Sequence, residues 1–97
     1  SKGAVAAMTR ALARELGMTK SGILVNAISP GYVHSANALA NVDQHSAFEE
    51  TAATMRLIER PQQPQDIAGA AMWLASAEGS YVNGQNIVVD GGIFFSQ

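Results

Sequence analysis

The stretch Ile-Leu-Val-Asn-Ala-Ile at residues 23–28 constrains the fold more than any other part of the sequence. It is short and almost continuously apolar. Lys20-Ser21-Gly22 precedes it and Ser29-Pro30-Gly31 follows it. A parallel strand buried on both faces has this pattern, whereas a half-exposed hairpin strand alternates polar and apolar residues. We therefore expect a buried parallel strand at residues 23–28.

A helix is predicted on the amino-terminal side of this strand, over Ser1–Leu16. Its apolar residues recur at spacings of three, four and seven, which places them in one stripe along a helix. Gly17 is well placed to end the helix in a left-handed conformation. The stripe consists of Ala4, Val5, Met8, Ala11, Leu12 and Leu16.

A second helix and a second strand are predicted on the carboxy-terminal side. Pro64–Ala75 predicts the helix, with Pro64 at its first position and Asp66 near the positive end of its dipole. Asn86–Val89 predicts another buried strand, and we expect Asp90-Gly91-Gly92 to turn the chain after it. Asn26 inside the first strand needs a hydrogen-bond partner, which we expect to be structural.

Residues from 29 to about 58 predict a long loop that contains a helix from Asp43 to about Ile58. The order of elements is that of half an α/β layered fold, in which the two strands form one parallel crossover. Two parallel strands do not make a sheet that stands alone, because one edge of the first strand has no partner. The fold therefore requires more strands than these 97 residues supply.

The composition bounds the class of protein. The chain has 97 residues, of which 47% are hydrophobic, so it holds enough apolar material for one small domain core. Only 14% of its residues are charged, against about 25% in a typical soluble domain. We infer that much of the surface is covered by something else.

Charge and cysteine content exclude several functions. A formal net charge of −2 argues against a nucleic-acid partner, which would need clustered Lys and Arg. The sequence has no cysteine, so it forms no disulfide framework and no thiolate metal site, which fits a cytoplasmic protein. The longest uncharged stretch, Ser21–Val42, contains Pro30 and many polar residues, so we expect no membrane span and see no secretory signal.

Four stretches of the sequence, in this order and spacing, resemble the carboxy-terminal portion of a short-chain dehydrogenase/reductase. They are Ser1-Lys2-Gly3-Ala4-Val5; Val25-Asn26-Ala27-Ile28-Ser29-Pro30-Gly31-Tyr32-Val33; Arg60-Pro61 through Pro64-Gln65-Asp66-Ile67-Ala68; and Leu74-Ala75-Ser76 through Val82-Asn83-Gly84-Gln85 to Val88-Val89-Asp90-Gly91-Gly92.

This resemblance implies a Rossmann-like doubly wound sheet, of which the two strands here would be the last two. Residues 1–97 would then be the carboxy-terminal part of a single domain, with a loop or lid over the substrate at about residues 29–58. The Gly-rich motif that binds the cofactor's pyrophosphate does not occur in the sequence.

The resemblance also implies an NAD- or NADP-dependent oxidoreductase that interconverts an alcohol and a carbonyl of a small-molecule substrate. In the family, a Tyr and a Lys four residues later face one site from one helix. Lys2 matches that Lys, and the Tyr would lie three residues before Ser1. A phenol ordinarily titrates near ~10, and the nearby ammonium lowers its pKa. Lys2 is the only member of the catalytic set present, so we expect residues 1–97 alone to be inactive.

The turn after the first strand carries the implied cofactor contacts. In the family, this turn binds the nicotinamide end of the cofactor, and it corresponds here to Pro30, Gly31, Val33 and Ser35. The backbone of Val33 would bond the nicotinamide carboxamide, and Ser35 stands where the family often has Thr.

Tyr32 and His34 flank this turn and could face the substrate. His34 has no partner at a metal-ligand spacing, since His45 lies eleven residues on, so we expect no metal site.

Other interpretations of the same residues stay open. Lys2 could be an ordinary solvated lysine, and the Pro30-Gly31 turn could be purely structural. The chain could also be a non-catalytic fragment that acts as an interaction or oligomerisation module, or one part of an assembly in which another chain supplies the first strands. In the family, the carboxy-terminal region and the helix that begins near Lys2 often lie in subunit interfaces. A homo-oligomer, a dimer or tetramer, is therefore expected for the parent protein.

Overall fold

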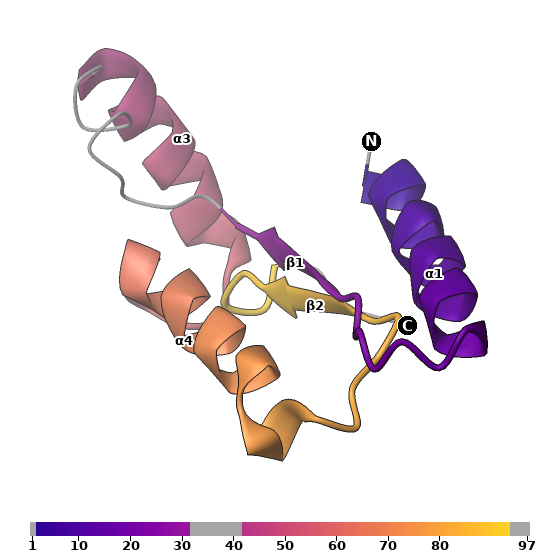
Figure 1. Cartoon of the computed structure of the whole chain (residues 1–97). Helices are drawn as coiled ribbons and strands as arrows, with labels where there is room; N and C mark the ends of the chain where they lie inside the picture. Colours follow the sequence, from indigo (N-terminus) through magenta and orange to yellow (C-terminus); the bar gives the residue numbers. More distant parts are fainter. Residues whose placement is uncertain (1, 32–41, 94–97) are drawn as a thin grey trace.

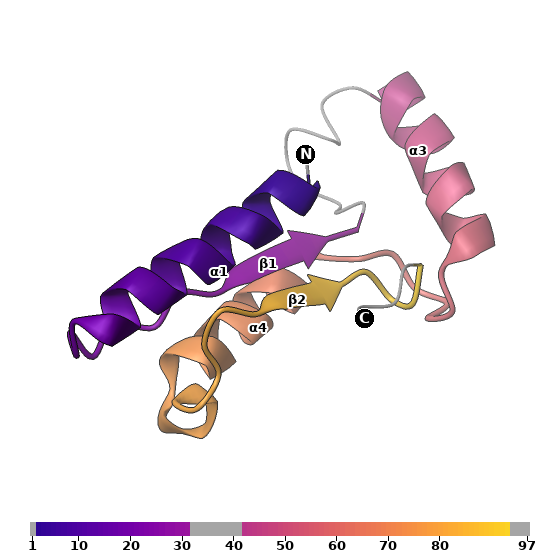
Figure 2. The same cartoon turned by 90° about the vertical axis from the view of Figure 1, so that its right-hand side faces the viewer.

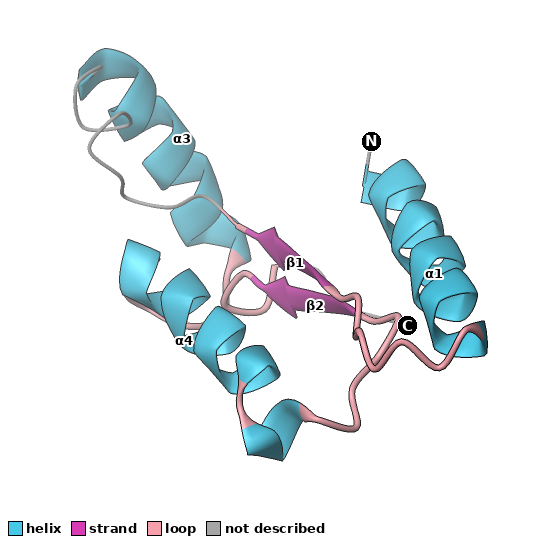
Figure 3. Cartoon of the chain, in the orientation of Figure 1, coloured by secondary structure: helices cyan, strands magenta, loops and turns pink. Residues whose placement is uncertain are grey.

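The structure, a computed structural model, describes residues 2–31 and 42–93. Helix α1 spans Lys2–Met18 and is followed by strand β1 at Ala27–Pro30. The elements after it are α3 at Val42–Met55, α4 at Pro64–Ala75, a 3-10 turn at Ala77–Gly79 and strand β2 at Asn86–Val89 (Figures 1 and 3).

The two strands lie side by side and run parallel. Their register pairs Ala27 with Asn86 and Pro30 with Val89. Helix α1 packs against β1 on one side of this pair, and α4 packs against both strands on the other side (Figures 1 and 2). This three-layer arrangement confirms the predicted α/β class.

Helix α4 and strand β2 occupy the predicted residues, Pro64–Ala75 and Asn86–Val89. Pro64 is at the start of α4, and the backbone N–H of the N-cap residue Gln63 donates to Oδ2 of Asp66 at 2.8 Å. These local signals are the ones that define a helix start from sequence. Helix α3 ends at Met55, three residues before the predicted end.

The predicted role of Gly17 as the end of the first helix is wrong. Helix α1 runs through Gly17 to Met18, and the left-handed residue is Lys20, with a φ of 58°. The N–H of Lys20 donates to the carbonyl of Gly17 at 3.0 Å, and the N–H of Ser21 donates to that of Leu16 at 3.4 Å. This pair of bonds is a Schellman motif, with a lysine at the position that glycine usually takes.

The bounds predicted for the first strand are also wrong, because β1 begins at Ala27 and includes Ser29 and Pro30. Upstream of Ala27, side chains replace the regular ladder. The N–H of Val25 donates to Oδ1 of Asn83 at 3.0 Å, and the N–H of Gly84 donates to the Val25 carbonyl at 2.8 Å.

Asn26 precedes the strand and has the structural partners expected of it. Its Nδ2 donates to the Val82 carbonyl at 2.9 Å, and its Oδ1 accepts from the Gln85 N–H at 3.0 Å.

The described residues bury a much smaller core than the composition suggests. The only apolar side chains buried among them are Ala13 and Ala52. β1 and β2 contain no buried residue, contrary to the expected burial on both faces, because each described strand has only one neighbour. Trp73, in helix α4, is 43% exposed.

The apolar stripe predicted on the first helix does not pack on the sheet. Thr9 and Ala13 are the buried residues of α1, whereas Val5, Met8 and Leu12 of the stripe are exposed. Because residues four apart are neighbours on a helix, Thr9 and Ala13 follow Val5 along one edge of the stripe. The stripe therefore remains available to residues outside the described part of the chain or to another molecule. Over residues 2–31 and 42–93, no helix is both long and apolar enough to cross a bilayer.

Candidate functional site

The carboxyl ends of β1 and β2 lie together, since Pro30 is paired with Val89. A cavity of about 150 Å³ opens beside them. Open α/β sheets bind their ligands outside the carboxyl ends of the strands. The cavity is lined by Arg56, Ile58, Arg60, Gln62, Asp66, Val89, Asp90 and Gly91.

Gly31, a predicted cofactor-binding residue, is held tightly at the end of β1. Its N–H is shared between the Val89 carbonyl and Oε1 of Gln62, each at 3.1 Å. A Cβ added to Gly31 would lie 2.8 Å from Oε1 of Gln62 and 3.1 Å from Cβ of Asp90. Glycine is favoured here because an added side chain would force Gln62 and Asp90 to move.

Gln62 joins the ends of the two strands. Its side-chain Nε2 donates to the Val89 carbonyl at 2.5 Å, while Oε1 accepts from Gly31. The residue is only 7% exposed, and both ends of its amide have partners, as burial of a polar group requires. Nothing in the sequence singles out Gln62, because its partners lie 27 and 31 residues away.

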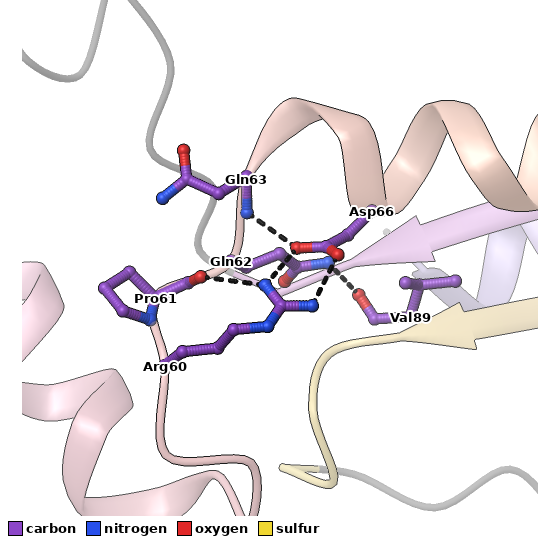
Figure 4. A network of polar contacts seen from close by, with 6 residues as sticks. All are labelled: Arg60, Pro61, Gln62, Gln63, Asp66 and Val89. Atoms are coloured by element: carbon purple, nitrogen blue, oxygen red, sulfur yellow. Dashed lines mark hydrogen bonds and ion pairs between the residues drawn. The ribbon is translucent and has the colours of Figure 1, made fainter.

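Arg60 and Asp66 form a clasp around the loop that carries Gln62 (Figure 4). The guanidinium donates through Nη1 to Oδ2 at 2.8 Å and through Nη2 to Oδ1 at 2.7 Å. Nη1 also donates to the carbonyl of Pro61 at 3.2 Å. The hydrogen bonds from Arg60 and from the Gln63 backbone lower the pKa of Asp66 from its ordinary value of 3.8 to about 2, and the pairing raises that of Arg60.

The turn after β2 has the structural role predicted for Asp90-Gly91-Gly92. Asp90 is 6% exposed, and its Oδ1 accepts the N–H of Gly92 at 2.9 Å and of Ile93 at 3.1 Å. Gly91 and Gly92 have φ values of 71° and 93°, which favour glycine. The carbonyl of Gly91 accepts from the N–H groups of Leu57 and Ile58 and so ties the chain after α3 to β2.

Arg56 is a further polar residue of the cavity. Its side chain is 7% exposed, and its Nη2 lies 2.6 Å from Oε1 of Glu49. Nε donates to the carbonyl of Ile58 at 3.0 Å, and Nη1 has no hydrogen-bond partner within the described part of the chain. No feature of the sequence separates Arg56 from an ordinary surface arginine.

The predicted site residues fall in different parts of the structure. Lys2 begins α1, and Pro30 and Gly31 lie at the carboxyl end of β1. Tyr32, Val33, His34 and Ser35 lie outside the described residues, so their predicted roles stay predictions. Over residues 2–31 and 42–93, no three His, Asp or Glu side chains gather as a metal site would need.

The sequence-family model described as enoyl-(acyl carrier protein) reductase matches residues 1–94. The chain belongs to the short-chain dehydrogenase/reductase family. A galactitol 2-dehydrogenase (L-tagatose-forming) of Cereibacter sphaeroides is 45% identical over 92 residues, which cover 95% of this chain and 35% of that relative. The chain thus spans about a third of the length of the curated relatives it matches.

Two solved structures with bound dinucleotide share the fold. A blue fluorescent protein from a metagenomic library, in complex with NADPH, superposes with a TM-score of 0.77 at 33% identity, over 95% of this chain and 35% of that one. A 4-hydroxyisoleucine dehydrogenase complexed with NADH gives a TM-score of 0.76 at 29% identity, over 95% of this chain and 37% of the other. These matches confirm the predicted membership in a Rossmann-fold family.

Replacing Gly31 by Ala tests the tight packing at the end of β1. The new Cβ would overlap Gln62 and the backbone of Asp90, so Gly31→Ala should destabilise the fold by about 1–3 kcal/mol in urea unfolding. Gly69→Ala is the matched control. Gly69 lies inside α4 with open space around it, so the added methyl should stabilise by about 0.5–1 kcal/mol. Equal stability of Gly31→Ala and the unchanged protein would contradict the packing described.

The clasp predicts how Asp66 titrates. Because its pKa lies below the ordinary value of 3.8, its carboxylate stabilises the fold above pH 3.8, and this contribution is lost as the pH falls through about 2. Arg60→Gln should raise the pKa of Asp66 towards 3.8, measured by NMR of its carboxyl carbon, and Arg10→Gln should leave it unchanged. An unshifted pKa in Arg60→Gln would show that the ion pair does not form.

Proposed function

We propose that the protein containing this chain is an NAD- or NADP-dependent oxidoreductase that interconverts an alcohol and a carbonyl. The match of residues 1–94 to the family carries this proposal. The NADPH and NADH complexes of the two similar structures support the cofactor class. The name of the galactitol dehydrogenase supports a small-molecule alcohol or carbonyl as substrate.

The cofactor would supply or accept the hydride, and the residues of this chain would position it and assist proton transfer. The described residues fit that role. The sheet's carboxyl edge carries the Pro30-Gly31 turn, whose start is fixed by Gln62 and Val89. In this proposal the residues that follow, Val33 through its backbone and Ser35 through its hydroxyl, hold the nicotinamide end. Tyr32 and His34 face the substrate.

Lys2 would be the catalytic residue of this chain. It begins α1, so a Tyr one helical turn earlier would share its face. The ammonium of Lys2 would favour the phenolate and bring the Tyr pKa closer to neutral pH, where the Tyr can give or take the substrate proton. Lys2 would also bond the hydroxyls of the nicotinamide ribose.

We further propose that residues 1–97 are the carboxy-terminal part of one Rossmann-like domain, with the substrate lid at about residues 29–58. The parent protein would be a cytoplasmic dimer or tetramer, without nucleic-acid or membrane partners. The exposed stripe of Val5, Met8 and Leu12 on α1 supports a subunit contact.

Substituting Lys2 tests the enzymatic proposal. Lys2→Met removes the ammonium and should lower kcat by roughly 10²- to 10⁴-fold, the usual contribution of positioned proton transfer. The pH at which the residual activity is highest should also rise, because the Tyr pKa is higher without the ammonium. Lys20→Met makes the same chemical change in the exposed turn after α1 and should leave kcat unchanged. Full activity in Lys2→Met would refute the role assigned to Lys2.

The second candidate function is a non-catalytic interaction module, and one observation favours it. Large apolar side chains on α1, α3 and α4 are exposed, among them Met8, Phe48 and Met72. A partner would bury them. A polypeptide of residues 1–97 produced alone should therefore associate with other molecules, and it should show no NAD(P)-dependent turnover because it holds only Lys2 of the catalytic set. Turnover by this polypeptide would contradict the expectation.

A further inference from the structure

We propose that Gln62 is a positioning residue for cofactor binding, acting through its hydrogen bonds to Gly31 and Val89. The inference rests on the proposed function, which places the nicotinamide cofactor at the carboxyl edge of the sheet. Gln62 itself lies in the loop between α3 and α4, and nothing in the sequence marks it for such a role.

The two bonds of Gln62 run in opposite senses. Nε2 donates to the Val89 carbonyl at 2.5 Å, and Oε1 accepts from the Gly31 N–H at 3.1 Å. Making both bonds at once requires a side chain with a donor and an acceptor, and the planar amide of Gln62 supplies one of each. The amide thereby bridges the last pair of the ladder, Pro30–Val89, where the two strands end.

The bridge holds Gly31 on more than one side. A Cβ added to Gly31 would lie 2.8 Å from Oε1 of Gln62 and 3.1 Å from Cβ of Asp90, so both residues border this glycine. Since Gly31 is the last described residue before the proposed cofactor segment, its position sets the point from which that segment leaves the sheet. In this proposal, a displacement of Gly31 would alter the cofactor contacts of that segment.

The loop that carries Gln62 is itself fixed to helix α4. The carboxylate of Asp66 accepts from Arg60 and from the Gln63 backbone, while Arg60 also bonds the Pro61 carbonyl (Figure 4). These bonds hold the residues before and after Gln62. They therefore fix the backbone from which its side chain reaches the ends of the two strands. The same cavity is lined by the charged groups Arg56, Arg60, Asp66 and Asp90.

Three variants of the purified protein test the inference. Gln62→Met keeps the length of the side chain and removes both bonds. Gln62→Glu keeps an acceptor for Gly31 and, when ionised, loses the donor to Val89. Gln65→Met makes the same change as Gln62→Met on an exposed residue of α4. For each we would measure the dissociation constants of NADH and NADPH by fluorescence, KM and kcat, and Tm.

We expect Gln62→Met to weaken cofactor binding by roughly three- to tenfold, the effect of one net hydrogen bond. KM for the cofactor should rise by the same factor, and kcat at saturating cofactor should change little. Gln65→Met should match the unchanged protein in cofactor dissociation constant, KM and kcat. If Gln62 had only a structural role, Gln62→Met would lower Tm and leave the cofactor dissociation constant of the folded protein unaltered.

The pH dependence of Gln62→Glu gives an independent readout. A protonated carboxyl has one donor and one acceptor and therefore replaces both bonds of the amide. Burial raises the pKa of such a carboxyl above its ordinary value, and the guanidiniums of Arg56 and Arg60 in the same cavity oppose part of this rise. Cofactor affinity of Gln62→Glu should approach that of the unchanged protein as the pH is lowered from 8 to 5. The ratio of the cofactor dissociation constant of Gln62→Met to that of the unchanged protein should stay constant over the same pH range.

The outcomes separate the inference from the proposed function. If the unchanged protein binds neither NADH nor NADPH, the oxidoreductase proposal fails and the inference fails with it. If the unchanged protein binds a dinucleotide and Gln62→Met binds it equally well, the inference alone is overturned. Weaker binding in Gln62→Met, with recovery of Gln62→Glu at low pH, supports it.

Discussion

The parallel pairing of β1 and β2 is the constraint on which the described structure depends, and side-chain amides fix it at both ends. At the amino end, Asn26 and Asn83 bond the backbone of the opposite segment. At the carboxyl end, Gln62 bonds the backbone of both strands. A four-residue ladder by itself leaves register weakly specified, since it contributes few bonds. Amides that bind the flanking backbone remove that ambiguity, because a slip by one residue would break these hydrogen bonds.

The register then determines where the candidate site lies. Pairing Pro30 with Val89 brings the Pro30-Gly31 turn beside the Asp90-Gly91 turn. Helix α4 packs on the same strands, so its amino end reaches this edge with Arg60 and Asp66. The ion pair there contributes little stability by itself, because exposed pairs are screened by solvent. Its consequence is geometric: it fixes the loop that places Gln62 between the two strand ends.

Elements with complete local signals could be predicted from the sequence, and elements that depend on distant partners could not. α4 has a proline at its start and an acidic residue in its first turn, and both α4 and β2 were predicted with their observed bounds. The predicted position of β1 differs from the observed one because Val25 and Asn26 form hydrogen bonds with a segment almost 60 residues away. Gly17 resembled a helix end, yet the Schellman bonds form one turn later, at Lys20.

The same distinction applies to the site. Lys2, Pro30 and Gly31 were predicted as site residues from the resemblance to the family, whose short motifs carry information about long-range structure. Gln62 lies between the quoted residues of the third stretch, and its contacts form only when the loop before α4 meets the ends of β1 and β2. Arg56 belongs to no such motif, and its partners Glu49 and Ile58 are close to it in the chain. A glutamine between two prolines is unremarkable as sequence. It becomes informative when the structure shows that its side chain is buried and makes two hydrogen bonds of opposite direction.

The small buried core explains why the strand ends depend on polar contacts. The described residues bury only two alanines as apolar core, whereas large side chains such as Met72 and Trp73 stay exposed. Hydrophobic burial, normally the dominant stabilising contribution, is therefore small among the described residues. Apolar packing is non-directional and does not fix the position of a backbone to a fraction of an ångström. Directional hydrogen bonds from Gln62 and Asp90 fix the backbone at the carboxyl ends of β1 and β2, where the turn after β1 begins.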